Sequence, residues 1–204
     1  METILSGIEW AVASASASVD EPNGDAWLVR PRGAGALIAV LDGVGHGTFA
    51  AEAAALACGV LIRSSDAPLP EIVRLCHAEL QGRRGIALGL AAYDPARSAL
   101  EWIAVGHIQA HLARRATDGR PRMSTLIAAS GIVGRGVPPV RSEIVEVEPG
   151  DLLALATDGL RPEFADTLPL AGGLQATADG LLNGFRRGHD DAVALLAILS
   201  GAGT

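Results

Sequence analysis

The chain is built around one stretch, Leu37-Ile38-Ala39-Val40-Leu41-Asp42-Gly43-Val44-Gly45-His46-Gly47-Thr48. An apolar run of strand length ends at a carboxylate, and three glycines follow in the next five positions. The alanine-rich segment after them predicts a helix over residues 48–62. A buried strand therefore delivers Asp42 to its end, and the glycine turn lets backbone groups approach whatever Asp42 binds.

The same pattern returns at residues 152–159, where an apolar run ends in Thr157-Asp158-Gly159. An aspartate at a strand end is also common turn chemistry, and for either motif alone a turn is the simpler interpretation. Two buried strands that both end in Asp-Gly favour a polynuclear metal site instead.

Composition limits the class of protein. The 204 residues fit one domain or at most two small ones, and 49% hydrophobic residues with only 3% aromatics predict an aliphatic core. A net charge of -7 argues against general nucleic-acid binding, which needs a basic face. We expect no nucleic-acid partner.

Location and redox state are predicted from a few features. Cys58 and Cys76 lie among helix-like apolar residues and are interpreted as reduced core residues. The N-terminal residues lack the pattern of a signal peptide, and no apolar run approaches the roughly 18 residues of a membrane span. We expect a cytoplasmic protein without membrane contact.

The order of elements predicts an α+β fold with antiparallel sheets, because most connections between strands are short. We expect a meander over residues 86–114, with hairpin turns at 94–98 and 117–120, and a strand pair around Pro149-Gly150. Asp118 is therefore interpreted as a turn residue. The predicted strands are 8–18, 25–30, 35–41, 86–93, 99–105, 108–114, 144–147, 152–156 and 192–199, and the predicted helices are 48–62, 70–80 and 173–187.

Acidic residues recur at strand edges beside glycine or another aspartate. Hard divalent cations take oxygen ligands, and carboxylates from different strands repel one another unless a cation lies among them. Two such ions about 3.5–4 Å apart would activate a shared water. The positions are Asp25, Asp42, Asp158 and the Asp190-Asp191 pair.

The ordered set of motifs resembles the PPM-type metal-dependent Ser/Thr protein phosphatases, in particular their bacterial SpoIIE-like branch. The short chain is most similar to the RsbX stressosome feedback phosphatases. The resemblance covers residues 24–199. It rests on Gly24-Asp25, Asp42-Gly43-Val44-Gly45-His46-Gly47, Leu75-Cys76-His77-Ala78-Glu79-Leu80, Gly82-Arg83-Arg84-Gly85, Trp102-Ile103-Ala104-Val105-Gly106-His107, Ser130-Gly131-Ile132-Val133-Gly134, Thr157-Asp158-Gly159-Leu160 and Asp190-Asp191.

The resemblance implies a four-layer α-β-β-α sandwich, two antiparallel sheets with helix pairs outside, as a single domain over residues 1–204. It also implies a centre of two Mn²⁺ or Mg²⁺ ions. Asp42 would bridge the ions, the Gly43 carbonyl would join it, Asp158 and Asp190 would bind one ion, and Asp25 the other, directly or through water. Asp42 and Asp158 would be the catalytic residues, and the substrate-binding residues stay unassigned.

Histidines and arginines near the motifs leave alternatives open. Many relatives outside the bacterial branch carry a histidine directly after Asp-Gly, where this chain has Val44, so His46 is not expected to donate the proton. His107 is a candidate for lining the site. Arg83 and Arg84 could grip a phosphoryl group or form a solvated loop. The remaining histidines, His77, His111 and His189, are expected at the surface, partly buried or in a loop.

The implied activity is hydrolysis of phosphoserine or phosphothreonine by a metal-activated water. The implied partners are phosphorylated bacterial signalling proteins of the stressosome or STAS-domain type. Two alternatives stay open: a catalytically silent docking module with the same fold, and a metallophosphatase for a small metabolite. The absence of lysine excludes a Walker phosphate loop.

Overall fold

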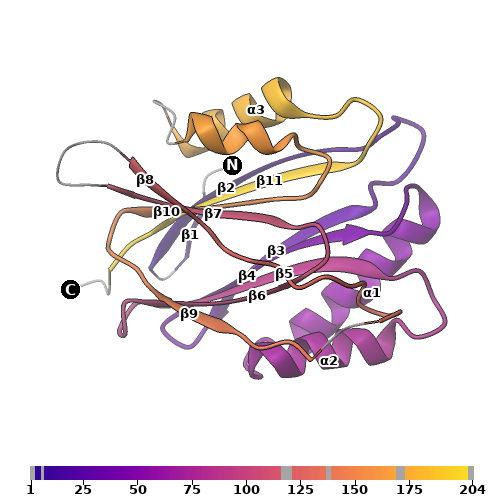
Figure 1. Cartoon of the computed structure of the whole chain (residues 1–204), viewed down its shortest axis with the longest axis horizontal. Coiled ribbons are helices and arrows are strands. Elements are labelled where there is room, and N and C mark those ends of the chain that lie inside the picture. Colours follow the sequence, from indigo (N-terminus) through magenta and orange to yellow (C-terminus); the bar gives the residue numbers. More distant parts are fainter. Residues whose placement is uncertain (1–2, 6, 116–120, 137–138, 169–172, 202–204) are drawn as a thin grey trace.

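The computed structural model describes residues 3–5, 7–115, 121–136, 139–168 and 173–201. Two antiparallel sheets stack face to face, and helices cover both outer faces (Figure 1). The six-stranded sheet has the order β1-β2-β11-β10-β7-β8 and the five-stranded sheet the order β3-β4-β5-β6-β9. This is the four-layer α-β-β-α sandwich expected from the sequence.

The bounds of the elements follow the predicted ones closely in most places. The strands are β1 (Thr3–Leu5), β2 (Ile8–Ala15), β3 (Asp25–Arg32), β4 (Gly35–Gly43), β5 (Ile86–Asp94), β6 (Ala99–Val105), β7 (Gln109–Arg115), β8 (Pro121–Thr125), β9 (Glu143–Glu146), β10 (Asp151–Ala156) and β11 (Ala192–Leu199). The helices are α1 (Thr48–Arg63), α2 (Leu69–Glu79), the 3-10 helix η1 (Pro162–Thr167) and α3 (Leu174–Phe185).

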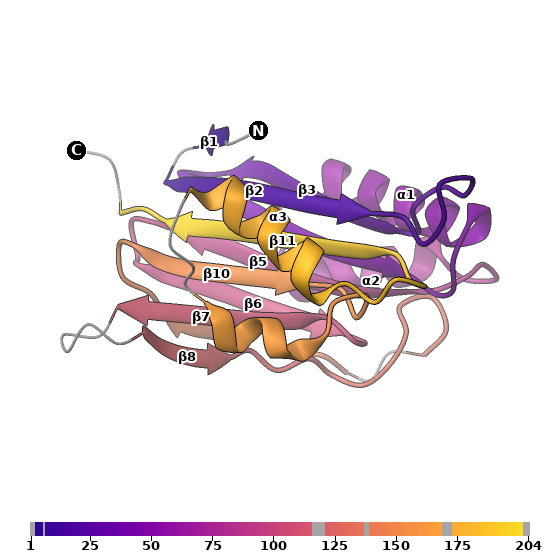
Figure 2. The ribbon, with the colours of Figure 1, turned by 90° about the horizontal axis from the view of Figure 1, so that it is seen from above.

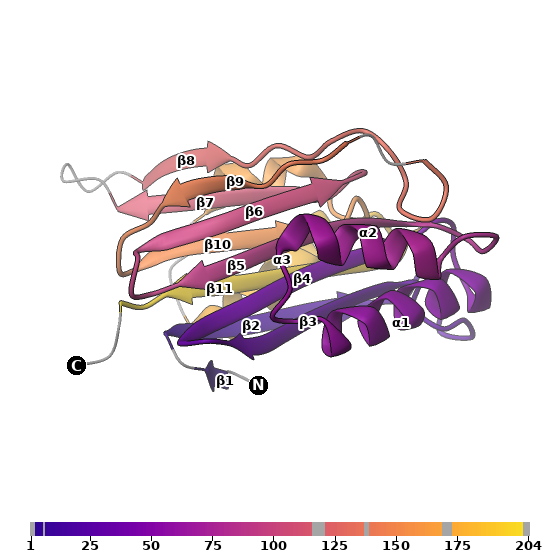
Figure 3. The same cartoon turned by 90° about the horizontal axis from the view of Figure 1, so that it is seen from below.

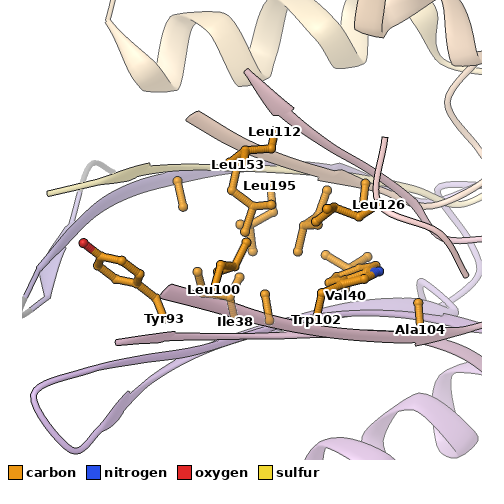
Figure 4. Close-up of a cluster of buried hydrophobic side chains, with 14 of the residues drawn as sticks. Ile38, Val40, Tyr93, Leu100, Trp102, Ala104, Leu112, Leu126, Leu153 and Leu195 are labelled. Carbon is orange, nitrogen blue, oxygen red and sulfur yellow. The ribbon is translucent and has the colours of Figure 1, made fainter. Parts of the chain in front are cut away.

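The central core lies between the two sheets (Figure 4). Ile38 and Trp102 point into it from one sheet, and Leu112, Leu153 and Leu195 from the other. Trp102 is the largest fully buried side chain, and its indole N–H donates to the Ile127 carbonyl at 3.0 Å. Apart from Tyr93, the remaining central core is aliphatic and alanine-rich, as the composition predicts.

The outer layers differ from each other. Helices α1 and α2 lie side by side across the five-stranded sheet (Figure 3) and bury residues such as Leu61, Ile72 and Cys76 against it. The six-stranded sheet is covered by α3 (Figure 2) and by η1, whose Phe164 is buried. The expected helix pair on this side is therefore one α-helix and a 3-10 helix in the described residues. Cys58 and Cys76 are free thiols, and burial raises their pKa values to about 11 and about 12.

Two sequence-based expectations about strand pairing were wrong. The predicted meander is interrupted, because β6 pairs within the five-stranded sheet and β7 within the six-stranded one. The strands on either side of Pro149-Gly150 also belong to different sheets, since β9 pairs with β6 and β10 with β7 and β11. A short loop at a left-handed glycine, Gly106 or Gly150, can cross between sheets as easily as it can close a hairpin.

Smaller differences also occur. The first long strand ends at Ala15 rather than at residue 18, and β1, β8 and η1 were not predicted. The hairpin between β5 and β6 is confirmed, with Tyr93 opposite Leu100. Strands β7 and β8 also pair, but the predicted turn at 117–120 with Asp118 lies outside the described residues. Within the described residues, no helix has both the length and the apolar character that a membrane crossing needs.

Gly180 gives a direct test of helix α3. An added Cβ there meets nothing within 4 Å, and its φ is not in the left-handed region. Gly180→Ala should raise the free energy of unfolding by about 0.5–1 kcal/mol, because alanine loses less backbone freedom on helix formation. Chemical denaturation measures the change.

Gly33→Ala is the matched control for this prediction. Its added Cβ also meets open space, but its φ of 57° is left-handed. This substitution should destabilise by about 1 kcal/mol. Equal effects of the two substitutions would contradict the assigned backbone geometry.

Candidate metal centre

Two carboxylates meet at one end of the five-stranded sheet. Asp25 is the first residue of β3 and lies directly opposite Asp42, the last but one residue of β4. The apolar run before Asp42 forms the buried inner strand β4, which pairs with β3 on one side and β5 on the other. The strand thus delivers Asp42 to its end, as its sequence predicts.

Two more carboxylates come from the six-stranded sheet. Asp158 follows the end of β10, and Asp190 precedes the start of β11, its neighbour. Thr157 fixes this corner, because its N–H donates to the Val193 carbonyl at 3.2 Å and its hydroxyl accepts from the Val193 N–H at 2.9 Å. The two Asp-bearing segments of this sheet are therefore held together by the backbone.

Asp191 joins the two sheets. Its side chain is only 3% exposed and accepts hydrogen bonds from the N–H groups of Gly24 at 2.8 Å and Ala17 at 2.7 Å. The Gly24 carbonyl in turn accepts from the Gly43 N–H at 3.1 Å. The sequence left Asp191 as an unassigned neighbour of the ligands, and the structure makes it the residue that positions the Gly24-Asp25 turn.

The carboxylates interact electrostatically across the gap between the sheets. Burial raises the pKa of Asp42 to about 8, and the charges of Asp25, Asp158 and Asp190 add to the effect. Burial likewise raises the pKa of Asp25 to about 7, against a hydrogen bond with Thr157 that lowers it. The pKa of Asp158 is raised by burial and then by Asp190. Repulsion of this kind identifies one shared acidic site.

The donor set fits a hard divalent cation. Buried oxygen Oδ2 of Asp25 has no hydrogen-bond partner, although an unpaired buried carboxylate oxygen is costly. All candidate ligands offer oxygen, which Mg²⁺ and Mn²⁺ prefer. Among the described side chains, no three or more His, Cys, Asp or Glu already converge to hold an ion.

Two glycines make the close packing at the site possible. A Cβ on Gly43 would lie 2.4 Å from the Ala50 carbonyl oxygen of α1. A Cβ on Gly159 would lie 1.8 Å from the carbonyl oxygen of Asp191. The glycine of each Asp-Gly pair therefore allows close packing, of Gly43 against α1 and of Gly159 against Asp191, in addition to the approach to a ligand expected from the sequence.

An open cavity of about 370 Å³ adjoins the carboxylates. Asp42 and Asp158 line it together with residues 128–132, Val44 and His107. His107 Nδ1 lies 3.8 Å from Asp158 Oδ2, so this histidine lines the cavity beside the candidate site. Sequence reasoning missed the contributions of Ala87, Ala128 and Ala129, because small apolar residues carry no chemical signature.

The other candidates lie away from this cavity. His46 is exposed and its Nδ1 lies 2.7 Å from Glu21 Oε2, which raises the pKa of His46. Arg83 pairs with Glu52 at 3.1 Å, and Arg84 donates to the Val44 carbonyl at 3.1 Å. Neither arginine lines the cavity with the carboxylates.

The remaining histidines have ordinary surroundings. The ring of His77 accepts a hydrogen bond from the Gly134 N–H at 3.0 Å, and His111 stacks edge-on against Phe164. His189 is exposed in the loop before Asp190. Partly buried or loop positions were predicted for all three.

The raised pKa values predict how the stability of the metal-free protein depends on pH. Asp25 and Asp42 keep a proton in the folded state up to pH about 7 and about 8, whereas their ordinary pKa is 3.8. The folded state thus binds more protons than the unfolded chain across this window, and the free energy of unfolding falls as pH rises from about 4 to 8. Thermal unfolding in chelator should give a lower midpoint at pH 8 than at pH 6.

Asp42→Asn serves as the control for this pH dependence. It removes one of the two titrating groups, so the difference between the two midpoints should shrink. A midpoint that does not fall with pH, or one that falls equally in the variant, would contradict the assigned environment of Asp42.

The fold has close counterparts among solved structures. A chain from a study of the bacterial stressosome, described as a modular system adapted to control secondary messenger signalling, superposes with a TM-score of 0.84 at 26% identity, covering 93% of this chain and 98% of that one. RsbX in complex with magnesium gives 0.84 at 19% identity, with 98% and 99% covered. The catalytic domain of the phosphatase PstP with two manganese ions gives 0.71 at 18% identity, with 95% and 98% covered.

The fold is that of the PPM-type phosphatases, and the family match together with the phosphatases of this fold supports the expected enzyme class, a phosphoprotein phosphatase. The family described as Stage II sporulation protein E (SpoIIE) matches residues 32–198. The chain therefore belongs to the SpoIIE family. No curated protein sequence is significantly similar to it.

Proposed function

We propose that this protein is a divalent-metal-dependent protein serine/threonine phosphatase. Its substrates would be phosphoserine and phosphothreonine on bacterial signalling proteins of the stressosome or STAS-domain type. The single observation that carries the proposal is the electrostatic coupling of carboxylates from both sheets at one end of the sandwich, where Asp25 lies opposite Asp42 and its buried Oδ2 is unpaired. The similar chain from a stressosome study, and the magnesium and manganese in two of the similar structures, support it.

The proposed metal ligands keep the roles expected from the sequence. Asp42 would bridge two ions, with the Gly43 carbonyl beside it. Asp158 and Asp190 would hold one ion and Asp25 the other. When bound, Mn²⁺ or Mg²⁺ would supply positive charge for the phosphoryl oxygens and activate a water for attack on phosphorus.

The chain's own residues position these groups and the substrate. Asp191 and Thr157 fix the backbone of the ligand segments, as described above. The cavity beside Asp42 and Asp158 is wide and open, which suits a phosphorylated side chain presented on a protein surface. Because His46 pairs with Glu21 outside this cavity, we assign it no role in protonating the leaving serine oxygen.

Metal dependence tests the proposal. We expect Mn²⁺ or Mg²⁺ to support turnover of p-nitrophenyl phosphate, of a phosphoserine peptide and of phosphorylated STAS domains. Chelator should reduce each rate by at least on the order of a hundredfold, because the activated water and the charge neutralisation are both lost. Full activity in stripped protein would contradict the mechanism.

The same assays separate the two alternative functions. A silent docking module would bind a phosphorylated STAS domain without hydrolysing any of the three substrates. A small-metabolite phosphatase would turn over p-nitrophenyl phosphate but leave phosphoproteins intact. The single domain over residues 1–204 and the cytoplasmic location remain predictions from the sequence.

A further inference from the structure

A second cavity, of about 470 Å³, opens beside helix α1. We call it the arginine pocket, because Arg83, Arg84 and Arg135 line it against a single acidic residue, Glu52. The exposed ring of Phe49 forms part of its wall. This concentration of positive charge is unusual in a chain whose net charge is -7.

The arginines lie in two turns, residues 82–85 with Arg83 and Arg84, and residues 132–136 with Arg135. Backbone hydrogen bonds hold these two turns together. Ile86, which follows the first turn, exchanges two hydrogen bonds with Val133, at 3.0 and 2.9 Å. The second turn is closed by bonds between Ile132 and Gly136 and is fastened to α2 by the Gly134 N–H, which donates to His77. The arginine pocket is therefore a defined feature of the fold, formed by anchored turns.

The arginine pocket adjoins the cavity of the metal centre. Val44 lines that cavity, and its backbone bonds both to the Gly85 carbonyl at 3.0 Å and to the Arg84 guanidinium. Ile132 lines the same cavity, and Arg135 follows it three residues later in the same turn. Val44 and the turn at residues 132–135 thus form a ridge between the two cavities. A peptide bound at one cavity can reach the other across this ridge.

The chemistry of the pocket selects the kind of peptide. The Arg84 guanidinium lies 5.6 Å from the centre of the Phe49 ring, and that ring is 65% exposed. Arg83 forms an ion pair with Glu52, and within the described residues the side chain of Arg135 has no hydrogen bond or ion pair, while its backbone N–H donates to the Ile132 carbonyl. Guanidinium groups bind carboxylates in a bidentate manner, and an exposed aromatic ring offers apolar contact. Acidic side chains match this surface, whereas basic ones are repelled.

We propose that the arginine pocket binds an acidic segment next to the phosphorylated residue of the protein substrate. This inference rests on the proposed phosphatase function and adds its sequence preference. The ordinary alternative is a solvated basic patch that contributes nothing to substrate choice. The two interpretations differ in whether the charge at Arg135 changes turnover of peptides according to their flanking residues.

The test is a charge swap at Arg135. Two phosphoserine peptides, one with glutamates and one with lysines flanking the phosphoserine, are compared with p-nitrophenyl phosphate, which has no flanking segment. Wild type should prefer the acidic peptide. Arg135→Glu should lower kcat/KM for the acidic peptide by about fivefold to tenfold and raise it for the basic one, since an attraction becomes a repulsion.

Arg97→Glu is the matched control. It makes the same change of charge on an exposed residue of the hairpin between β5 and β6, at the opposite end of β5 from the ridge. This variant should leave the preference unchanged, and p-nitrophenyl phosphate turnover should be equal in all three proteins. High salt should weaken the preference of the wild type.

The outcomes separate this inference from the proposed function. Normal p-nitrophenyl phosphate turnover with no flanking preference, or an equal effect of Arg135→Glu and Arg97→Glu, would overturn the arginine pocket as a docking site and leave the phosphatase intact. Absence of turnover by the wild type on all three substrates would instead overturn the proposed function. A loss of p-nitrophenyl phosphate turnover in Arg135→Glu, with an unchanged melting temperature, would show that Arg135 acts on the phosphoryl group and would also overturn the docking role.

Discussion

Asp42→Asn should reduce phosphatase turnover by on the order of a thousandfold. Asp42 lies at the end of the buried strand β4, opposite Asp25. The charges of four other aspartates, Asp25, Asp158, Asp190 and Asp191, raise its pKa. Asparagine keeps the shape of the side chain but removes the negative charge that would hold two cations together. At pH 8, where metal-free Asp42 begins to ionise, the metal-free variant should be no less stable than metal-free wild type, because the cost of burying that charge disappears.

Asp66→Asn is the control for Asp42→Asn. Asp66 is exposed, and it lies near Arg32, at the other end of β3 from Asp25. It should keep full turnover. If Asp42 were a structural turn residue instead of a ligand, its replacement would destabilise the fold by around 1 kcal/mol with or without metal. Phosphatase assays and thermal unfolding in chelator distinguish the two roles.

Gly159→Ala should damage both the fold and the activity. The added Cβ would lie 1.8 Å from the Asp191 carbonyl oxygen and 2.8 Å from its carbon, so the backbone itself must move. We expect a loss of about 3 kcal/mol in the free energy of unfolding, as for severe overpacking. Since Asp191 holds Gly24 and Ala17, the displacement should also misplace Asp25 and lower turnover even at temperatures where the variant is folded.

Gly188→Ala is the matched control in the same region. It lies two residues before Asp190, and its added Cβ meets nothing within 4 Å. Its stability and turnover should stay close to those of the wild type. If Gly159→Ala were equally harmless, the packing of the Asp158 segment against Asp191 would be wrong.

The sequence predicted the positions of the aspartates at strand ends better than the connections between strands. An apolar run that ends in Asp-Gly has strong local causes, so the places of Asp42 and Asp158 at strand ends could be predicted. The pairing of β9 with β6 could not, because the turn at Gly150 has the same local sequence whether the next strand stays in the sheet or crosses to the other. Sheet membership depends on contacts between residues far apart in the chain.

The supporting residues of the site were harder to predict than the ligands. In the sequence Asp191 is an unassigned neighbour of Asp190, and only the placement of the Gly24 and Ala17 N–H groups shows its positioning role. Only part of the arginine pocket could be predicted from the sequence, because Arg83 and Arg84 are adjacent in the chain. Arg135 joins them only through the pairing of Ile86 with Val133, which has no signature in the sequence.

Binding of Mn²⁺ to metal-stripped protein, measured by titration calorimetry for wild type and Asp42→Asn, tests the central claim most directly. The claim is that carboxylates from both sheets form one divalent metal centre. It predicts saturable binding of two Mn²⁺ ions per wild-type chain and a marked loss of affinity in Asp42→Asn. Absence of saturable binding to the folded wild-type protein, or binding of equal stoichiometry and affinity to Asp42→Asn, would contradict it.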